Sequence, residues 1–302
     1  CGQIREAHLE RIQPLRLEVD SRATSPDQKN LEQVLDTWMD RLLEELRSLR
    51  GSQLSYNCFY DQVVGYGEIL STALVSAYFD QNGWGHRWVD ARDVLVTDAT
   101  WRDARIQWEP TIQRLHEVHQ EDYRNHQGVQ CVLTQGFIGR DPLGRTTTLG
   151  REGSDFTAAI LATSLDAESV TIWKDVPGVL NADPKLFPNT QKFEELRYRE
   201  AAEMTYFGAS VIHPKTIKPL ANACIPLFVK SFLDPEGAGT KIHEHAASHE
   251  VPTLVLKKSQ VLVSFKVTDF TFIEEKHIHA IYEKLKELKL QKKVIGSGLQ
   301  IT

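Results

Sequence analysis

The chain of 302 residues has little sulfur, with four cysteines and two methionines. No two cysteines form a CxxC pair, and their positions do not resemble a disulfide framework, so free thiols in a reducing compartment are expected. No signal peptide is recognisable, and no apolar run is long enough to span a bilayer. These absences predict a cytoplasmic location and exclude the common cysteine-based metal motifs.

Basic residues are not in excess either, since the formal net charge is −6. A nucleic-acid surface needs a concentrated basic stripe, so nucleic acid is not an expected partner. The phosphate-binding pattern G-x-x-x-x-G-K-[ST] does not occur, which disfavours a P-loop fold. Apolar residues make up 41% of the chain, which is ordinary for a globular protein. The length allows a large α/β domain and a smaller one.

Helical and extended patterns alternate along the chain. Helices are predicted over residues 1–50, 69–80, 154–166, 194–204 and 216–223. Strands are predicted over residues 84–89, 94–96, 128–138, 169–173 and 226–230, and the run at 128–138 is apolar enough for burial on both faces. The alternation predicts a three-layer αβα sandwich around a mainly parallel sheet.

The composition becomes polar and turn-rich around residues 231–250, so we predict a first domain at 1–245 and a second at 246–302. In the second, residues 253–267 alternate like a strand or hairpin. A helix with an apolar face follows, marked by Ile278, Ile281, Tyr282, Leu285 and Leu288. So small an α+β unit cannot bury its apolar face alone. We expect it to be part of a larger regulatory module or to pair with another copy.

Chemistry concentrates in residues 134–159, TQGFIGRDPLGRTTTLGREGSDFTAA. A buried strand there leads through a glycine-rich loop into a helix that Ser154 or Asp155 is expected to cap. Helix N-termini attract anions, and Arg151 can hold a carboxylate with two hydrogen bonds. The hydroxyls of residues 146–148 are expected to add polar contacts. A well-capped helix alone would explain part of this pattern, but the density of glycine, hydroxyl and arginine favours a site for a small anionic ligand.

Three motifs resemble those of the aspartokinases, within the amino acid kinase family. They are G-F-I-G with T-T-L-G-R-E-G-S-D-F-T-A-A, then W-K-D-V-P-G with N-A-D-P-K, and G-A-S-V-I-H-P. The resemblance spans about residues 1–245, and the tail is similar to part of an ACT domain. It implies the amino acid kinase fold followed by a small α+β ACT-like module.

The resemblance also implies roles for single residues. Asp155 matches the catalytic carboxylate that orients groups around the reacting phosphate. Glu68, in the segment Gly65-Tyr66-Gly67-Glu68, matches a glutamate that holds the substrate ammonium. The substrate site would be lined by Arg151, Glu152, Gly153 and Ser154. Nucleotide contacts would come from Lys174, Asp175, Leu180, Lys185, Ser210 and Val211.

Two departures from the family pattern matter. Members of the family carry an N-terminal Lys-Phe-Gly-Gly-Thr-Ser strand whose lysine contacts the transferring phosphate, and this sequence has none. We therefore expect a further segment before Cys1. Position 210, often lysine in the family, is Ser210, so Lys185 or Lys215 would supply the charge instead.

The activity that the resemblance implies is ATP-dependent, Mg²⁺-assisted phosphorylation of the β-carboxylate of L-aspartate. The product is 4-phospho-L-aspartate, at the first step of lysine, threonine and methionine biosynthesis. A homo-oligomer with feedback control by lysine or threonine is also implied. Two alternatives stay open: a kinase of another acidic amino acid or a carbamate, and a non-catalytic amino-acid sensor. The simplest alternatives for single residues are a helix-solvating role for Glu68, a plain turn at Asp183-Pro184, and a packing role for His213.

Overall fold

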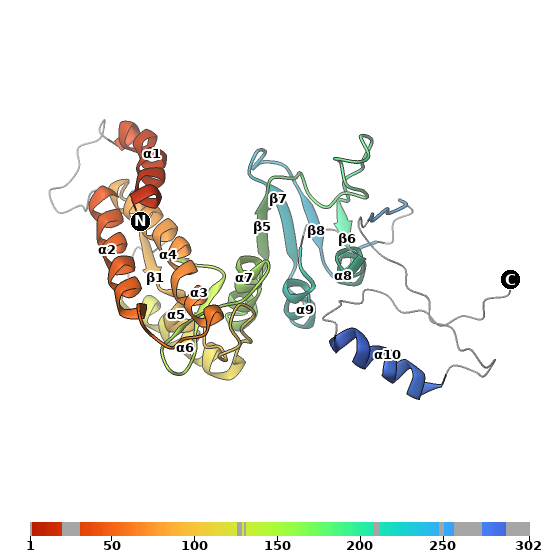
Figure 1. The fold of residues 1–302 in the computed structure, drawn as a ribbon. Helices are drawn as coiled ribbons and strands as arrows, with labels where there is room; N and C mark the ends of the chain where they lie inside the picture. The colour runs from red at the N-terminus through yellow and green to blue at the C-terminus, as the bar shows by residue number, and fades with distance from the viewer. Residues whose placement is uncertain are drawn as a thin grey trace.

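The computed structural model describes residues 2–19, 31–125, 129, 131–207, 212–247, 251–256 and 274–287. Figure 1 shows a largely helical N-terminal part, a central sheet carrying its own helices, and a separate helix in the tail. The helices are α1 (Gly2–Val19), α2 (Leu31–Leu49), α3 (Tyr56–Val64), α4 (Tyr66–Gln81), α5 (Ala91–Val94), α6 (Trp108–Asn125), α7 (Gly153–Ser164), α8 (Tyr198–Phe207), α9 (Pro214–Asn222) and α10 (Glu275–Glu287). The strands are β1 (His86–Val89), β2 (Cys131–Thr134), β3 (Ile138–Arg140), β4 (Thr146–Thr148), β5 (Val170–Lys174), β6 (Glu195–Leu196), β7 (Leu227–Ser231) and β8 (Thr240–Ile242).

The spacing of apolar residues explains helices α2 and α4, and an N-cap residue explains where α3 begins. Leu31, Leu35 and Leu42 recur at helical spacing in α2 and are buried in one cluster with Leu70 of α4. Burying a leucine side chain contributes about 1.5–3 kcal/mol, so this face fixes α2 against α4. Helix α3 begins where the Ser55 side chain accepts a hydrogen bond from a backbone N–H in the first turn. The predicted helix at 69–80 is thereby confirmed. The predicted helical character of residues 1–50 is confirmed over α1 and α2, while residues 20–30 lie outside the described residues.

Strands β1 and β2 pair in parallel, with His86 opposite Cys131 and Val89 opposite Thr134. The predicted strand at 84–89 is confirmed. The prediction that residues 128–138 form one strand buried on both faces is wrong, because Val132 is 49% exposed. In addition, Phe137 adopts a positive φ of 71°, which ends the extended run before β3.

Residues 94–96 do not form the strand that the apolar triplet predicted. Asp90 accepts a hydrogen bond from the N–H of Arg92 and starts the single turn α5, which includes Val94. Val96 then makes an isolated parallel bridge with Arg140 of β3. Local capping at Asp90 therefore overrides the β propensity of the triplet.

The glycine-rich loop after β2 is not wholly irregular. Strands β3 and β4 form an antiparallel hairpin, with Ile138 opposite Thr148 and Arg140 opposite Thr146. The turn between them is closed by Asp141, whose carboxylate accepts hydrogen bonds from the Arg145 backbone and guanidinium. The hairpin places the end of β4 directly before the segment that leads to α7.

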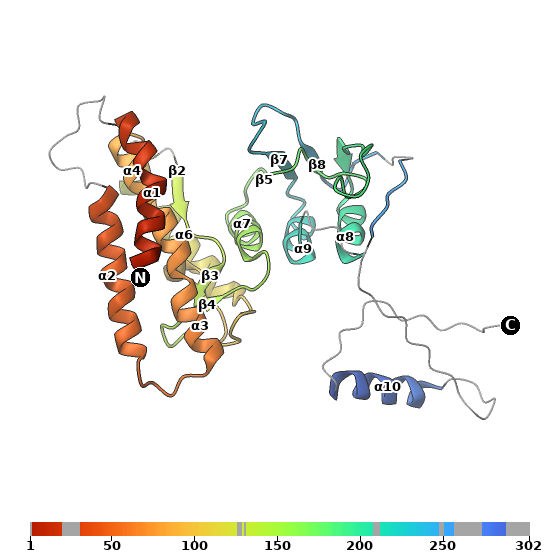
Figure 2. The same ribbon diagram turned by 45° about the horizontal axis from the view of Figure 1, so that its top comes forward.

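The C-terminal sheet has the strand order β5-β7-β8-β6. Strand β5 pairs with β7 in parallel, as β6 does with β8, whereas β7 and β8 are antiparallel. Helices α7, α8 and α9 lie together along this sheet (Figure 2). Ile172, Leu227 and Leu220 are buried in the core between sheet and helices, whereas Thr171 and Trp173 on the other face of β5 are exposed.

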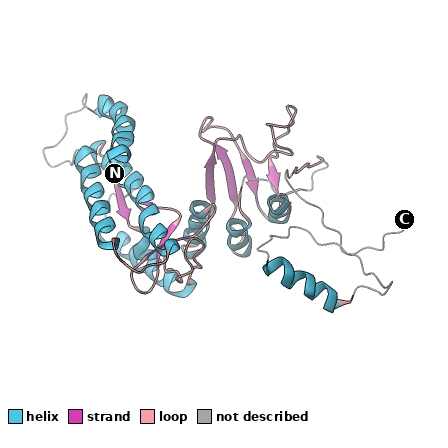
Figure 3. Ribbon diagram, in the orientation of Figure 1, coloured by secondary structure: helices cyan, strands magenta, loops and turns pink. Residues whose placement is uncertain are grey.

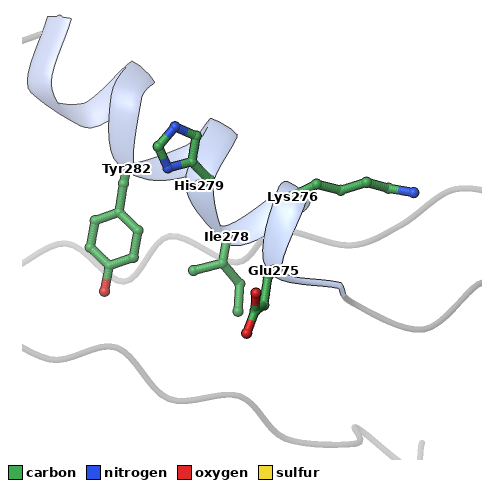
Figure 4. Close-up of a pocket in the computed structure, with 5 residues that line it drawn as sticks. All are labelled: Glu275, Lys276, Ile278, His279 and Tyr282. Carbon is green, nitrogen blue, oxygen red and sulfur yellow. The ribbon is translucent and has the colours of Figure 1, made fainter.

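Figure 3 shows that the described strands are confined to the middle of the chain, between the N-terminal helices and α10. The predicted tail helix is confirmed as α10, but most of the predicted strand at 253–267 lies outside the described residues. Glu275, Ile278 and Tyr282 point to the same side of α10, where they line a hollow (Figure 4). None of the described helices has the length and apolarity needed to cross a membrane.

Candidate active site

Two charged side chains from separate elements meet where β5 ends and α7 begins. Lys174, the last residue of β5, has its Nζ 2.7 Å from Oδ2 of Asp155 in the first turn of α7. The lysine side chain is 25% exposed and the aspartate 13%, so the pair is partly shielded from water. The fold thus brings together one residue predicted for the nucleotide and the residue predicted for catalysis.

The start of α7 differs from the prediction. Glu152 is the N-cap residue, its φ is +54°, and its side chain makes no cap hydrogen bond. The prediction that Ser154 or Asp155 caps the helix is wrong, because both lie inside its first turn. The left-handed backbone of Glu152 lets the helix begin at Gly153. Amides of a helix start that lack a side-chain cap are suited to bind an anion.

Two glycines allow this helix start to pack against the hairpin. A Cβ at Gly136 would lie 2.7 Å from the Cα of Ser154. A Cβ at Gly153 would lie 2.8 Å from the ring of Phe137. Both distances are shorter than any real contact, so only glycine fits at these positions. The first turn of α7 is thereby held directly against the end of the segment that follows β2.

The left-handed backbone of Glu152 is expected to lower the stability of the folded protein. We expect Glu152→Gly to raise the free energy of unfolding by about 1 kcal/mol, because a left-handed conformation costs an L-residue roughly that much and glycine almost nothing. Thermal unfolding of parent and variant measures the difference. Gly144→Ala, which imposes a side chain on a φ of +81° in open space, should give a shift of the opposite sign. An unchanged melting temperature for Glu152→Gly would contradict the strain.

Arg151 is available to a ligand. Its side chain is 80% exposed, and the nearest acidic oxygen is Oε1 of Glu152, at 3.8 Å. The other oxygen of that carboxylate, Oε2, is buried and has no hydrogen-bond partner among the described residues. A guanidinium held this loosely can turn toward a substrate carboxylate. Ser154 beside it is also exposed, whereas Gly153 is buried.

Glu68 lies in the first turn of α4 and is half-buried. Burial raises the pKa of its carboxyl above the ordinary value. Within the described residues the carboxylate of Glu68 has no cationic partner, and a half-buried acid without one is a common feature of binding sites. An ammonium group would compensate this charge.

The three threonines of β4 do not face a ligand, contrary to the prediction. The Oγ1 of Thr147 is 2.6 Å from that of Thr97, and the Thr148 hydroxyl donates to Asp61. Thr146 is also buried, and Arg92 donates a long hydrogen bond to its hydroxyl. These hydroxyls satisfy one another and their neighbours inside the protein. Their function is to hold the hairpin.

The other predicted nucleotide residues follow β5. Asp175 and Lys185 are exposed, whereas Leu180 is half-buried and bridges to Lys192. The carboxylate of Asp183 accepts a hydrogen bond from the Lys185 N–H, which is the plain turn considered for Asp183-Pro184. The structure therefore places these residues on one segment but does not bring their side chains together. Ser210 and Val211 lie outside the described residues.

Helix α9 adds two residues near the start of α7. His213 is the N-cap of α9 and accepts a hydrogen bond from the Lys215 N–H, which supports the packing role considered for it. Burial lowers its pKa, while the charge of Glu152 acts in the opposite direction. The ammonium of Lys215 forms an ion pair with Asp103. Lys215 therefore has an acidic partner in this structure, and the prediction that Lys185 or Lys215 supplies the charge missing at Ser210 stays a prediction.

The chain is similar to proteins of known family. A model of the amino acid kinase family matches residues 5–231. The lysine-sensitive aspartokinase 3 of Escherichia coli is 37% identical over 229 residues, covering 75% of this chain and 50% of that protein. The aspartokinase of Chlamydia pneumoniae is 34% identical over 243 residues, covering 79% of this chain and 52% of that protein.

A solved structure of Escherichia coli aspartokinase III in complex with aspartate and ADP is similar in fold. The TM-score is 0.65 at 35% identity, covering 72% of this chain and 48% of that one. The chain thus spans about half the length of the relatives it matches. The predicted α/β fold class is confirmed by this likeness. With the matched region covering most of its length, the chain belongs to the amino acid kinase family.

Proposed function

We propose that the protein transfers the γ-phosphate of ATP to the β-carboxylate of L-aspartate and releases 4-phospho-L-aspartate and ADP. The observation that carries this proposal is the contact of Lys174 with Asp155 at the uncapped start of α7. A cation, a carboxylate and outward amides at one point suit a phosphoryl group in transfer. The aspartokinase relatives support aspartate as the acceptor.

In this proposal the substrate lies between α4 and the start of α7. Arg151 binds the α-carboxylate with its exposed guanidinium. Glu68 binds the ammonium group, which compensates its half-buried charge. The backbone of Glu152 and Gly153 and the exposed Ser154 complete the wall of the site. Asp155 orients the reacting groups and the Lys174 ammonium.

ATP lies beyond the end of β5 in this proposal. Lys174 and Asp175 face its phosphates, while Leu180 and Lys185 contact the rest of the nucleotide together with Ser210 and Val211. We assign Mg²⁺ to the ATP phosphates, where it would neutralise charge.

The proposed reaction does not require the protein to transfer a proton. A β-carboxylate is ionised at neutral pH, so it can attack the phosphorus in line without a general base. The chain's own residues then act by positioning the two anions and by neutralising the charge that develops between them. This requirement explains why the candidate residues are cations, a carboxylate and backbone amides.

Arg151→Ala tests the substrate site. We expect the KM for aspartate to rise about 10- to 100-fold, because two charge-assisted hydrogen bonds to the substrate are lost. The KM for ATP should change less than twofold. Coupled ADP-release kinetics of the full-length protein provide both constants. Arg199→Ala removes another highly exposed guanidinium, on α8, and should change neither constant. An unchanged aspartate KM in Arg151→Ala removes this residue from the site.

The acceptor and the regulation can be tested in the same assay. Glutamate and acetylglutamate in place of aspartate distinguish an aspartate kinase from kinases of other acidic amino acids. Absence of turnover with every acceptor would favour an amino-acid sensor. We also propose a homo-oligomer that binds a feedback amino acid through an ACT-like tail, and the lysine-sensitive relative supports lysine as the first to test. A ligand that binds the folded protein raises its melting temperature.

A further inference from the structure

Asp61 of α3 is a buried carboxylate with no part in the proposed chemistry. Its side chain is fully buried. Oδ2 accepts hydrogen bonds from the backbone N–H groups of Arg102, at 2.9 Å, and Thr148, at 3.0 Å. Oδ1 accepts one from the Thr148 hydroxyl, at 2.9 Å. Three donors from two distant segments therefore converge on one carboxylate.

Burying a carboxylate is energetically unfavourable unless hydrogen bonds compensate its charge. Burial raises the pKa of Asp61, and the hydrogen bonds from Arg102 and Thr148 counteract part of that rise. The donors are separated from Asp61 by 41 and 87 residues along the chain. The carboxylate thus ties together three segments that nothing local would keep in register.

The Arg102 segment is held by two contacts from α3. Its backbone N–H donates to Asp61, and its guanidinium carbon lies 4.7 Å from the centre of the Tyr60 ring. Arg102 also has a positive φ of 66°. The N–H of Ala104 donates to the Thr148 carbonyl, at 2.9 Å, and joins this segment to β4. An unfavourable backbone is therefore kept in place by α3 and β4 together.

The Arg102 segment also packs against the loop that carries Arg151. A Cβ at Gly150 would lie 3.0 Å from the Arg102 carbonyl oxygen and 2.8 Å from Oδ1 of Asp103. Gly150 has a φ of +79° and directly precedes Arg151. The direction in which the chain leaves β4 is thus set by contact with residues that Asp61 holds.

Helix α3 also leads into the helix of Glu68. Gly65 joins α3 to α4, and a Cβ there would lie 3.1 Å from the Thr146 methyl group. Gln62 exchanges two hydrogen bonds with the Thr146 backbone, at 2.7 and 3.1 Å. The α3–α4 junction and β4 therefore form one packed unit. Glu68 follows the junction in the chain, and Arg151 follows β4.

We propose that Asp61 is a positioning residue that fixes the Arg151 loop relative to Glu68 and so sets the geometry of the aspartate site. This inference rests on the proposed function. Asp61 touches neither substrate nor nucleotide in this account. It acts by holding the backbones of Arg102 and Thr148, so its geometry matters and its charge does not.

The test compares Asp61→Ala with Asp61→Asn in the full-length protein. We expect Asp61→Ala to raise the aspartate KM about tenfold, because misplacing a binding group lowers its contribution steeply. The KM for ATP should stay within twofold. Asparagine can accept both backbone N–H groups with its oxygen and donate to the Thr148 hydroxyl with its nitrogen. Asp61→Asn should therefore keep the parent aspartate KM within about twofold.

Tyr198→Phe is the control. It removes a buried side-chain hydrogen bond, from the Tyr198 hydroxyl to the Ile225 carbonyl, in the C-terminal core and away from α3 and β4. We expect a lower melting temperature with an aspartate KM near the parent value. If Asp61→Ala does not fold, Thr148→Val carries the test by removing one hydroxyl donor, with an expected rise in aspartate KM of about threefold.

Different results would reject the proposed function and the positioning role of Asp61. Absence of aspartate phosphorylation by the unmodified protein would reject the proposed function itself. An active parent whose aspartate KM is unchanged in both Asp61→Ala and Thr148→Val would reject the positioning role alone. Loss of activity in Asp61→Asn as large as in Asp61→Ala would also reject it, because charge and not geometry would then matter.

Discussion

Asp155→Asn is expected to lower kcat for phosphoryl transfer about 10²- to 10³-fold, with a smaller change in the KM for ATP. The substitution keeps the size of the side chain but removes the charge that holds the Lys174 ammonium, whose Nζ is 2.7 Å from Oδ2. A cation that is no longer oriented stabilises the transferring phosphoryl group poorly, and losing one such group typically costs two to three orders of magnitude. Steady-state kinetics at saturating aspartate and ATP measure the effect.

Glu203→Gln is the control for this variant. It neutralises a carboxylate that also has a cationic partner, Arg199, but in this ion pair both side chains are exposed. Exposed pairs contribute little, so neither kcat nor the melting temperature should change measurably. If Asp155→Asn retained kcat within tenfold of the parent, the pair with Lys174 would be structural and Asp155 would lose its proposed role.

Gly136→Ala is expected to destabilise the protein by about 1–3 kcal/mol and to disturb aspartate binding as well. The added Cβ would lie 2.7 Å from both Cα and Cβ of Ser154, so the backbone of the α7 start has to move. Overpacking of this kind usually costs that much. Chemical denaturation measures the loss, and the KM for aspartate reports the displaced Arg151 loop.

Gly67→Ala provides the comparison. A Cβ at Gly67 meets nothing within 4 Å, and the residue lies in the first turn of α4. Alanine is the better helix former, so this variant should be equally stable or slightly more stable. Equal stabilities of Gly136→Ala and the parent protein would show that α7 can shift without cost, against the close packing described for the helix start.

Much of the fold could be predicted from the sequence because the signals were local. Strand β5 and helices α4 and α7 follow from apolar periodicity, and the predicted bounds differ from the observed ones by a few residues. The pairing of Asp155 with Lys174 was not predictable, although each had been singled out by its motif. Their proximity depends on how α7 packs against β5, which no local pattern reveals.

The hairpin β3–β4 shows where local evidence was available but misread. Asp141-Pro142-Leu143-Gly144 is a turn sequence, and the Gly144 φ of +81° is the left-handed position that such a turn requires. The run of threonines that follows favours a strand. The prediction that these hydroxyls contact a ligand treats the stretch as a loop, whereas in the hairpin they are buried.

Asp61 could not have been found in this way. Its hydrogen-bond donors come from segments 41 and 87 residues later in the chain. In the sequence it is one acid within the helix Tyr56–Val64, and helical surfaces carry many such residues. Only the packed structure distinguishes a buried carboxylate that joins three segments from one that is solvated.

The short segment after the sheet has a mechanical consequence. Strand β8 runs opposite to β7, so it finishes at Ile242, opposite Leu227, at the other end of the strands from Lys174. The chain then returns: the Leu254 N–H donates to the Asn181 carbonyl, at 2.8 Å, and the Asn181 amide donates to the Pro252 carbonyl, at 3.1 Å. A displacement of residues 251–256 would therefore act on Asn181, the residue next to Leu180, through these two hydrogen bonds.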